Sequence, residues 1–149
     1  MCGRVAEVLV KTRTDGEERY DEMVAFYKAY EEGKLDRKPG IAELGEARRI
    51  IAIRTDPIYR PVTVTAIGIG DVLFVGIGGE PFTEYAHRLR RELPCKMLLT
   101  GCNTNGAVGY LPTKAAFDEG GYEGRGTAFV PELEDLVLGK AKAIVADMQ

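Results

Sequence analysis

Three side chains in this sequence lie next to glycine or proline, at positions where binding and catalysis often occur in proteins. Glu80 closely follows a strongly apolar run, and Tyr110 and Tyr122 each follow a glycine. A carboxylate can bind a cation, and a phenol can act as a ligand, an acid or a hydrogen-bond donor. Glycines beside a tyrosine let the backbone approach a bound molecule closely. Two simpler interpretations remain open: Glu80 only offsets a helix dipole, and the tyrosines pack by their rings in a surface loop.

The sequence has one histidine and three cysteines, which limits what metal chemistry it can complete. His87 lies near the polar face of a predicted helix and is interpreted as a solvated side chain. Cys2, Cys95 and Cys102 lack metal-ligand spacing and are interpreted as buried free thiols, with a Cys95–Cys102 bridge as the alternative. Because zinc sites commonly use several His or Cys ligands, we do not expect this chain to complete a zinc site alone.

The composition is that of an ordinary globular domain. The chain has 149 residues, of which 45% are hydrophobic and 29% charged, and its net charge is -3. One domain over residues 1–149 is expected, and the mild acidity argues against nucleic acid as a partner. No apolar run reaches the roughly 18 residues of a membrane-spanning helix. The first residues lack the basic and apolar segments of a signal peptide, so the chain as written is expected to be cytoplasmic.

The N-terminal third predicts mainly helices. Apolar residues at helical spacing predict one helix over residues 4–12 and another from residue 20 to residue 33. The polar segment 34–45 is predicted to be a loop. Three isoleucines in the segment 48–53 predict a short strand.

The rest of the chain predicts a sheet with flanking helices. Strands are expected at 61–70 and 71–78, joined by a Gly70-Asp71 turn into an antiparallel hairpin. Further elements are a helix from 81 to 94, a buried strand at 96–101, a short helix at 113–118, a flexible loop at 120–124 and a helix at 131–147. The sequence therefore predicts a mixed α/β fold, in which helices flank a sheet of three to four strands that is partly antiparallel.

Three motifs together resemble the neutral/alkaline (non-lysosomal) ceramidase family, including its shorter bacterial members. They are Ile67–Phe82 (IGIGDVLFVGIGGEPF), Gly109–Thr113 (GYLPT) and Gly120–Glu123 (GGYE). Gly3–Leu9 also looks like the helix that, in this family, follows the upstream histidine-bearing region. The resemblance is strongest from Ile67 to Val130, and the order and spacing of the motifs make it specific.

The resemblance implies an amide hydrolase that acts on ceramide or related N-acyl lipids with one zinc ion and a metal-bound water. Family members hold the zinc with histidines, a glutamate and a tyrosine. The motifs place Glu80 and Tyr110 as zinc ligands and Tyr122 at the substrate amide. The family's zinc histidines lie upstream of the first residue here, and residues 105–107 (NGA) depart from the expected Asn-Asp.

Two functional hypotheses follow. In the first, the chain is the C-terminal part of a ceramidase-like zinc amidase, inactive alone, and binds zinc only when another segment or chain supplies the histidines. In the second, it is a non-catalytic α/β binding or scaffold module derived from that family. Because a partial domain leaves an apolar face uncovered, a homo-oligomer is expected in either case.

Overall fold

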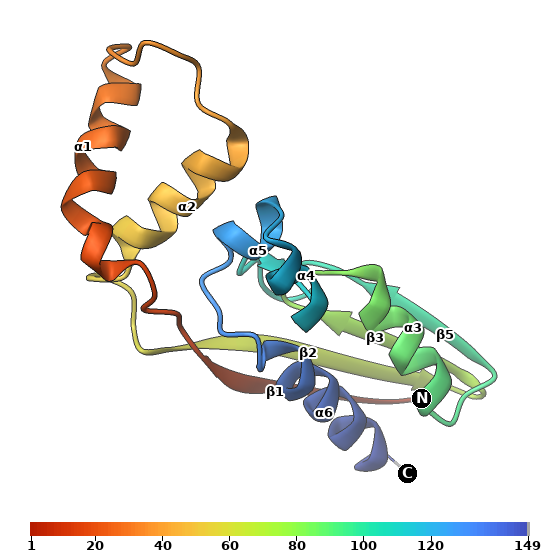
Figure 1. Cartoon of the computed structure of the whole chain (residues 1–149). Helices are drawn as coiled ribbons and strands as arrows, with labels where there is room; N and C mark the ends of the chain where they lie inside the picture. Colours follow the sequence, from red (N-terminus) through yellow and green to blue (C-terminus); the bar gives the residue numbers. More distant parts are fainter. Residues whose placement is uncertain (149) are drawn as a thin grey trace.

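A four-stranded mixed sheet forms the centre of the molecule. The computed structural model describes residues 1–148, and the sheet order is β1-β2-β3-β5 (Figure 1). The strands are β1 (Cys2–Lys11), β2 (Tyr59–Ile69), β3 (Val72–Ile77) and β5 (Met97–Gly101). The β1/β2 and β2/β3 pairs are antiparallel and the β3/β5 pair is parallel. The predicted mixed α/β class with a partly antiparallel sheet is therefore confirmed.

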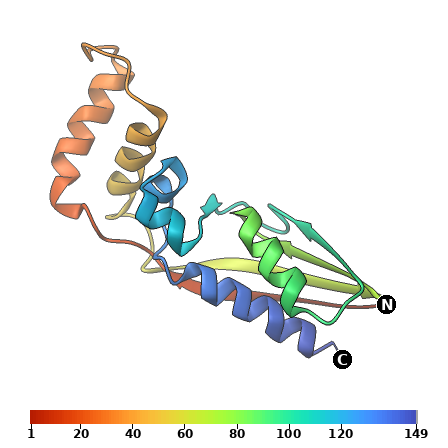
Figure 2. The same cartoon turned by 45° about the vertical axis from the view of Figure 1, so that its right-hand side comes forward.

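Two helices cover one face of this sheet. They are α3 (Thr83–Glu92) and α6 (Leu133–Ala146), which lie side by side on the same face (Figure 2). Alternation along each strand sends every second side chain toward these helices. Val62, Val64 and Ala66 of β2 are fully buried there, with Leu133 and Val137 of α6. This is the main hydrophobic core.

Among residues 1–148, no helix covers the opposite face of the sheet. Its exposed apolar side chains come from all four strands, and the strand register places them on one side. We call this surface the uncovered sheet face; it comprises Val5, Leu9, Ile67, Ile69, Val72, Met97 and Leu99. An exposed apolar surface of this kind usually marks an interaction site.

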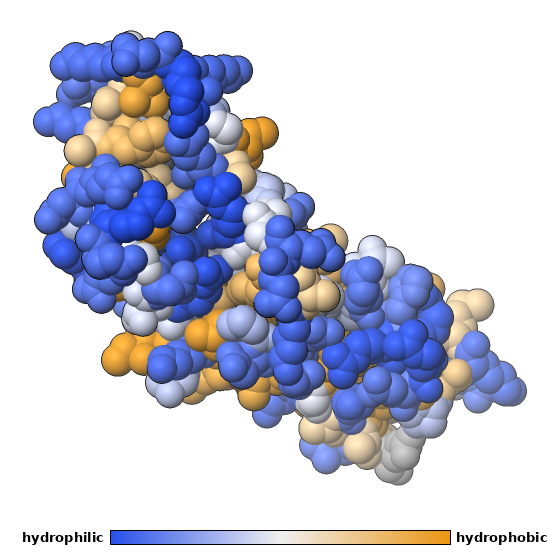
Figure 3. All heavy atoms as spheres, in the orientation of Figure 1, coloured by the Kyte–Doolittle hydropathy of each residue, from blue (hydrophilic) through white to orange (hydrophobic). Residues whose placement is uncertain are grey.

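A helical hairpin extends from the end of the sheet remote from the two chain termini (Figure 1). It consists of α1 (Tyr20–Glu31) and α2 (Ile41–Ala52), preceded by a short 3-10 helix at Glu17–Arg19. Its own small core is built around Met23, Ala47 and Ile50. On the face seen in Figure 3, hydrophobic residues lie between the two helices and hydrophilic residues border them.

Short elements connect the sheet to the hairpin. They are β4 (Glu80–Pro81), β6 (Tyr110–Leu111), α4 (Lys114–Glu119) and α5 (Tyr122–Gly126). The helix α4 begins where predicted, with the Thr113 hydroxyl accepting a hydrogen bond from the Ala116 N–H at 3.2 Å. Among residues 1–148, no helix has the length and apolar character needed to cross a membrane.

The predicted helix over residues 4–12 is wrong, because this segment is the strand β1. Val8 and Val10 point to the core, whereas Val5 and Leu9 lie on the uncovered sheet face. An apolar strand with both faces hydrophobic lacks clean alternation, and its valines can by chance match helical spacing. Pairing with β2 from Cys2 to Lys11 then decides the conformation. The helix suggested for Gly3–Leu9 by the family resemblance is wrong for the same reason.

The predicted loop is confirmed over residues 34–40 but wrong over residues 41–45, because α2 runs from Ile41 to Ala52. The predicted strand at 48–53 is wrong for the same reason. The Gly40 N–H donates to the Glu43 carboxylate at 3.4 Å, as in a capping box. Ile50 is buried against α1, and this tertiary contact outweighs the preference of β-branched residues for strands.

Three further predictions need correction in part. Gly120 and Gly121 lie between α4 and α5, as a loop, but residues 122–124 belong to the helix α5. The predicted strand at 96–101 exists, yet it is an edge strand in which only Leu98 is buried. The cysteines are free, as predicted, but Cys2 and Cys102 are exposed rather than buried.

Candidate functional site

Glu80 and Tyr110 are brought together by a short parallel pairing of β4 with β6. The two residues are direct partners in the register. The Glu80 N–H donates to the Gly109 carbonyl at 2.9 Å, and the Phe82 N–H donates to the Leu111 carbonyl at 3.2 Å. Glu80 was expected at a helix N-terminus, but α3 begins only at Thr83. Its carboxylate is therefore placed by strand pairing rather than by a helix cap.

Glycines before Glu80 allow this pairing. A Cβ atom on Gly79 would lie 2.9 Å from the Gly109 carbonyl oxygen. The loop leading to Tyr110 also folds back onto the two glycines that follow β3: the Asn103 N–H donates to the Gly79 carbonyl at 2.7 Å and the Val108 N–H to the Gly78 carbonyl at 3.1 Å. Side chains at either glycine would push this loop away. The GIGGE motif thus positions Tyr110 as well as Glu80.

Tyr122 completes the group from a third element. Its ring meets the ring of Tyr110 edge-on, with centroids 5.5 Å apart and planes at 74°. Tyr122 also lies beside Gly45 of α2, where an added Cβ would lie 3.2 Å from the Tyr122 ring. The structure therefore brings together all three residues singled out in the sequence. Gly45 was missed, since a glycine inside a segment predicted as a loop carries no signal of helix packing.

The electrostatics of the pair affect Tyr110. The Glu80 carboxylate, together with partial loss of hydration and the neighbouring Tyr122, raises the pKa of the Tyr110 phenol above its ordinary value. The phenol therefore stays protonated and can donate a hydrogen bond. A cation next to both oxygens would reverse this effect, because it favours the charged form of each group.

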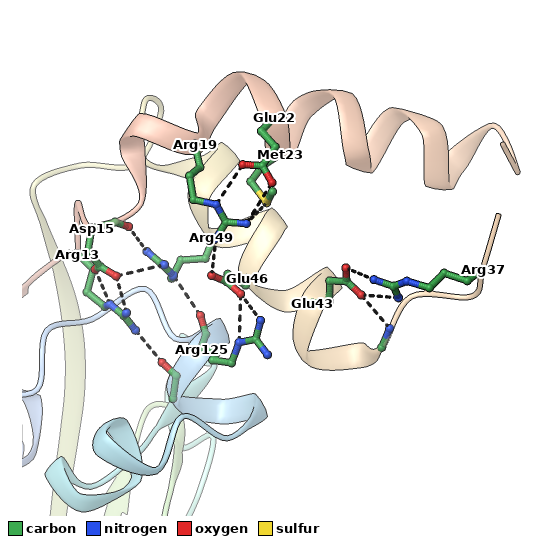
Figure 4. A network of polar contacts seen from close by, with 12 residues as sticks. Arg13, Asp15, Arg19, Glu22, Met23, Arg37, Glu43, Glu46, Arg49 and Arg125 are labelled. Atoms are coloured by element: carbon green, nitrogen blue, oxygen red, sulfur yellow. Dashed lines mark hydrogen bonds and ion pairs between the residues drawn. The ribbon is translucent and has the colours of Figure 1, made fainter. Parts of the chain in front are cut away.

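A network of arginines and carboxylates ties the helical hairpin to α5, which carries Tyr122 (Figure 4). The buried Arg49 of α2 donates from Nε to the Arg125 carbonyl at 3.0 Å and from Nη1 to the Asp15 carbonyl at 2.9 Å. Glu46 accepts from Arg19 at 3.1 Å and pairs with Arg125. Sequence patterns gave no sign of this network, because its members come from distant segments.

The remaining metal-ligand candidates are not part of this group. His87 is exposed on α3, as predicted for a solvated histidine. Within residues 1–148, no group of three or more His, Cys, Asp or Glu side chains could hold a metal ion. The described chain thus offers one carboxylate and one phenol at this place, which are two oxygen donors.

Comparison with solved structures relates this fold to part of a ceramidase. The crystal structure of neutral ceramidase from Pseudomonas aeruginosa matches with a TM-score of 0.53 and 15% identity, over 93% of this chain and 24% of that chain. A ceramidase complexed with C2 matches with a TM-score of 0.50 and 18% identity, over 60% of this chain and 15% of that chain. The chain therefore spans about a quarter or less of these proteins. No family model and no curated protein matches the sequence.

These likenesses establish the fold. The ceramidase-like relationship expected from the sequence motifs is confirmed at that level, and the match extends over both halves of the chain. The structure also shows that the three motif residues, Glu80, Tyr110 and Tyr122, lie together where β4, β6 and α5 meet.

Proposed function

We propose that this chain is the C-terminal part of a ceramidase-like, zinc-dependent amide hydrolase that acts on N-acyl lipids. The observation that carries the proposal is the register pairing of Glu80 with Tyr110, with Tyr122 packed against the same phenol. Three residues carried over from motifs far apart in the sequence meet at one place. A random set of surface residues would have no reason to do so.

The donor set fits half of a zinc site. Zinc in enzymes takes three protein ligands plus a water, from Cys, His and carboxylate groups. Glu80 and Tyr110 would supply two oxygens, and the histidines would come from another segment or chain. When bound, the ion supplies a water with a pKa near 7 and polarises the substrate carbonyl. Tyr122 would donate a hydrogen bond to the substrate amide and so orient it.

The uncovered sheet face is where we place the missing histidine-bearing segment. Thr104, in the loop before Tyr110, packs against Gly76, where an added Cβ would lie 2.5 Å from its side chain. Asn105 donates from Nδ2 to the Thr65 hydroxyl on the same face at 3.0 Å. A segment docked on this face therefore contacts the loop that carries Tyr110. Without that segment, the apolar face favours self-association.

Zinc titration by calorimetry tests the proposal. The chain alone should bind zinc weakly or not at all. Together with a histidine-bearing N-terminal part of a ceramidase, it should bind one zinc tightly and hydrolyse N-acyl lipids. Glu80→Gln and Tyr110→Phe should each weaken this binding. Tight one-to-one zinc binding by the chain alone would refute the view that the site is incomplete.

The alternative, a non-catalytic α/β binding or scaffold module, is favoured by one observation, the uncovered sheet face. It predicts that Glu80→Gln and Tyr110→Phe leave partner binding unchanged and that no complex depends on metal. Reconstituted complexes that hydrolyse amides only with intact Glu80 would exclude this alternative.

A further inference from the structure

Arg48 differs from the other arginines around the helical hairpin because it has no carboxylate partner. Within the described residues, every other arginine between 13 and 54, and Arg125, lies within 4.0 Å of an Asp or Glu oxygen. Arg48 instead donates from Nε to the Tyr27 hydroxyl at 2.8 Å. Its two Nη atoms have no hydrogen-bond partner within residues 1–148. The Nη N–H groups of this exposed guanidinium can therefore donate hydrogen bonds to a bound ligand.

The position of Arg48 relates it to Tyr122. Gly45, which touches the Tyr122 ring, precedes Arg48 by three residues in α2, so the two occupy neighbouring positions on one helix face. The rise between them is about 4.5 Å along the helix axis. Tyr27, Tyr30 and Tyr122 all raise the pKa of Arg48, with the Tyr27 hydrogen bond as the largest cause. The influence of Tyr122 is the smallest of these and agrees with the neighbouring positions of Gly45 and Arg48 on α2.

Tyrosines continue this surface in both directions. Tyr27 holds the guanidinium 5.4 Å from its ring centroid and also contacts Tyr30, with ring centroids 5.9 Å apart. On the other side, Tyr122 contacts Tyr110. A strip of phenols with one unpaired guanidinium thus leads from the candidate site onto the hairpin. Aromatic rings provide contact area for acyl or other apolar groups, and the guanidinium provides charge.

We propose that Arg48, held by Tyr27, binds an anionic group of the substrate beside the amide that Tyr122 contacts. The preferred substrates would then be N-acyl compounds with a carboxylate or a phosphate close to the amide nitrogen, rather than neutral N-acyl lipids. This inference rests on the proposed function, because that function places Tyr122 at the amide. The carboxylates of α2 do not compete for Arg48, since Glu43 pairs with Arg37 and Glu46 with Arg19 and Arg125.

Ligand binding to the whole chain tests the inference without requiring catalysis. The probes share one acyl amide: N-octanoylglycine, N-octanoylethanolamine and its O-phosphate. Calorimetry and tyrosine fluorescence report binding, and the absence of tryptophan leaves the tyrosine signal unobscured. We expect one or both anions to bind about threefold to tenfold more tightly than the neutral amide. The anion that shows the larger increase in affinity over the neutral amide identifies the carboxylate or the phosphate as the natural group.

Variants separate a binding role from a structural one. Arg48→Gln should reduce the affinity for the anions to that of the neutral amide and leave the neutral amide unaffected. Tyr27→Phe should give a smaller loss for the anions alone. The matched control is Arg91→Gln, which removes an exposed arginine without an ion pair in residues 1–148 and should change nothing. Equal affinity for all three probes, no saturable binding, or the same loss in Arg91→Gln would overturn the inference.

Failure of the proposed function would look different. Anion-selective binding with no amide hydrolysis after addition of the histidine-bearing segment would retain the subsite and reject the enzyme. Hydrolysis of neutral and anionic amides at equal rates would retain the enzyme and reject the subsite.

Discussion

The sheet with α3 and α6 and the hairpin of α1 and α2 are stabilised by different forces. In the sheet layer, side chains from four strands and two helices form one continuous apolar core. Within residues 1–148, the apolar cluster of the hairpin has three buried members, Met23, Ala47 and Ile50. Hydrogen bonds and ion pairs around Arg49 and Glu46 supplement it. Apolar burial is insensitive to pH, whereas ion pairs depend on the charge of both partners. Since Tyr122 contacts Gly45 of the hairpin, the position of Tyr122 in the candidate site depends on the region with the smaller apolar core.

The largest effect on the free energy of unfolding is expected in the core of the sheet layer. Leu133 of α6 is fully buried, and Leu133→Ala should lower the free energy of unfolding by about 2–5 kcal/mol through lost burial and a cavity. Leu136 on the outer side of the same helix is 41% exposed, and Leu136→Ala should cost less than about 1 kcal/mol. Urea unfolding measures both. Equal losses would contradict the assigned core face of α6.

A smaller and more local effect is expected in the hairpin. Arg49→Met keeps much of the side-chain volume but leaves the carbonyls of Asp15 and Arg125 without their donor, which costs about 1–3 kcal/mol. Hydrogen exchange should show the loss in α1, α2 and α5, with the sheet protected as before. As a control, Arg91→Met removes an exposed arginine of α3 that has no ion pair within residues 1–148, and it should leave exchange in the hairpin unchanged. Uniform deprotection of the whole chain would refute separate stabilisation.

Acid should open the hairpin before the sheet. A hydrogen bond from Arg13 lowers the pKa of Asp15 below 3.8. Partial burial of Glu46 opposes ionisation, yet the hydrogen bond and charge of Arg125 outweigh it and lower the pKa below 4.5. Because the folded pKa values lie below the unfolded ones, this stabilisation is complete above the unfolded values and is lost as the pH falls through the folded values.

The expected loss is about 1 kcal/mol between about pH 5 and about pH 3, confined to the hairpin. NMR signals of the Met23 methyl group should report it before those of core methyl groups in α6. Glu46→Gln should remove much of this pH dependence. An unchanged acid transition in that variant would show that other carboxylates control the opening.

The same contrast explains what could be predicted from the sequence. The β2–β3 hairpin and α6 were predicted because their patterns are local, with alternating or helically spaced apolar residues next to turn signals. The strand β1 was missed because both of its faces are apolar, and α2 because burial of Ile50 against α1 is a tertiary effect. The hairpin network could not be predicted, since ion pairs between distant segments leave no pattern in a single sequence.

The candidate site shows the same limit. Family motifs identified Glu80, Tyr110 and Tyr122, and the structure places them together. The residues that position them were not identified. Gly45 was hidden in a segment expected to be a loop, and the role of Arg48 depends on Tyr27 of another helix. Residues that would contact a ligand can be recognised by their type, whereas the residues that position them can be identified only from the fold.

The smallest effect on stability, and the largest on association, is expected at the uncovered sheet face. Leu98 and Leu99 are neighbours in β5, but Leu98 is 5% exposed in the core and Leu99 is 51% exposed on the open face. Leu99→Glu should change the free energy of unfolding by less than about 0.5 kcal/mol and yet prevent self-association, because it places a charge on the apolar contact surface. Leu98→Glu should prevent folding, since a carboxylate would be buried without a partner.

Sedimentation velocity over a range of concentrations measures this association. A wild-type chain that stays monomeric at high concentration would refute it. The histidine-bearing segment should dissociate the wild-type oligomer if both occupy the same face, and Leu99→Glu should then weaken zinc-dependent reconstitution although Leu99 is no ligand. If Leu99→Glu does not change zinc-dependent reconstitution, the histidine-bearing segment binds at another place. The uncovered sheet face would then serve self-association only.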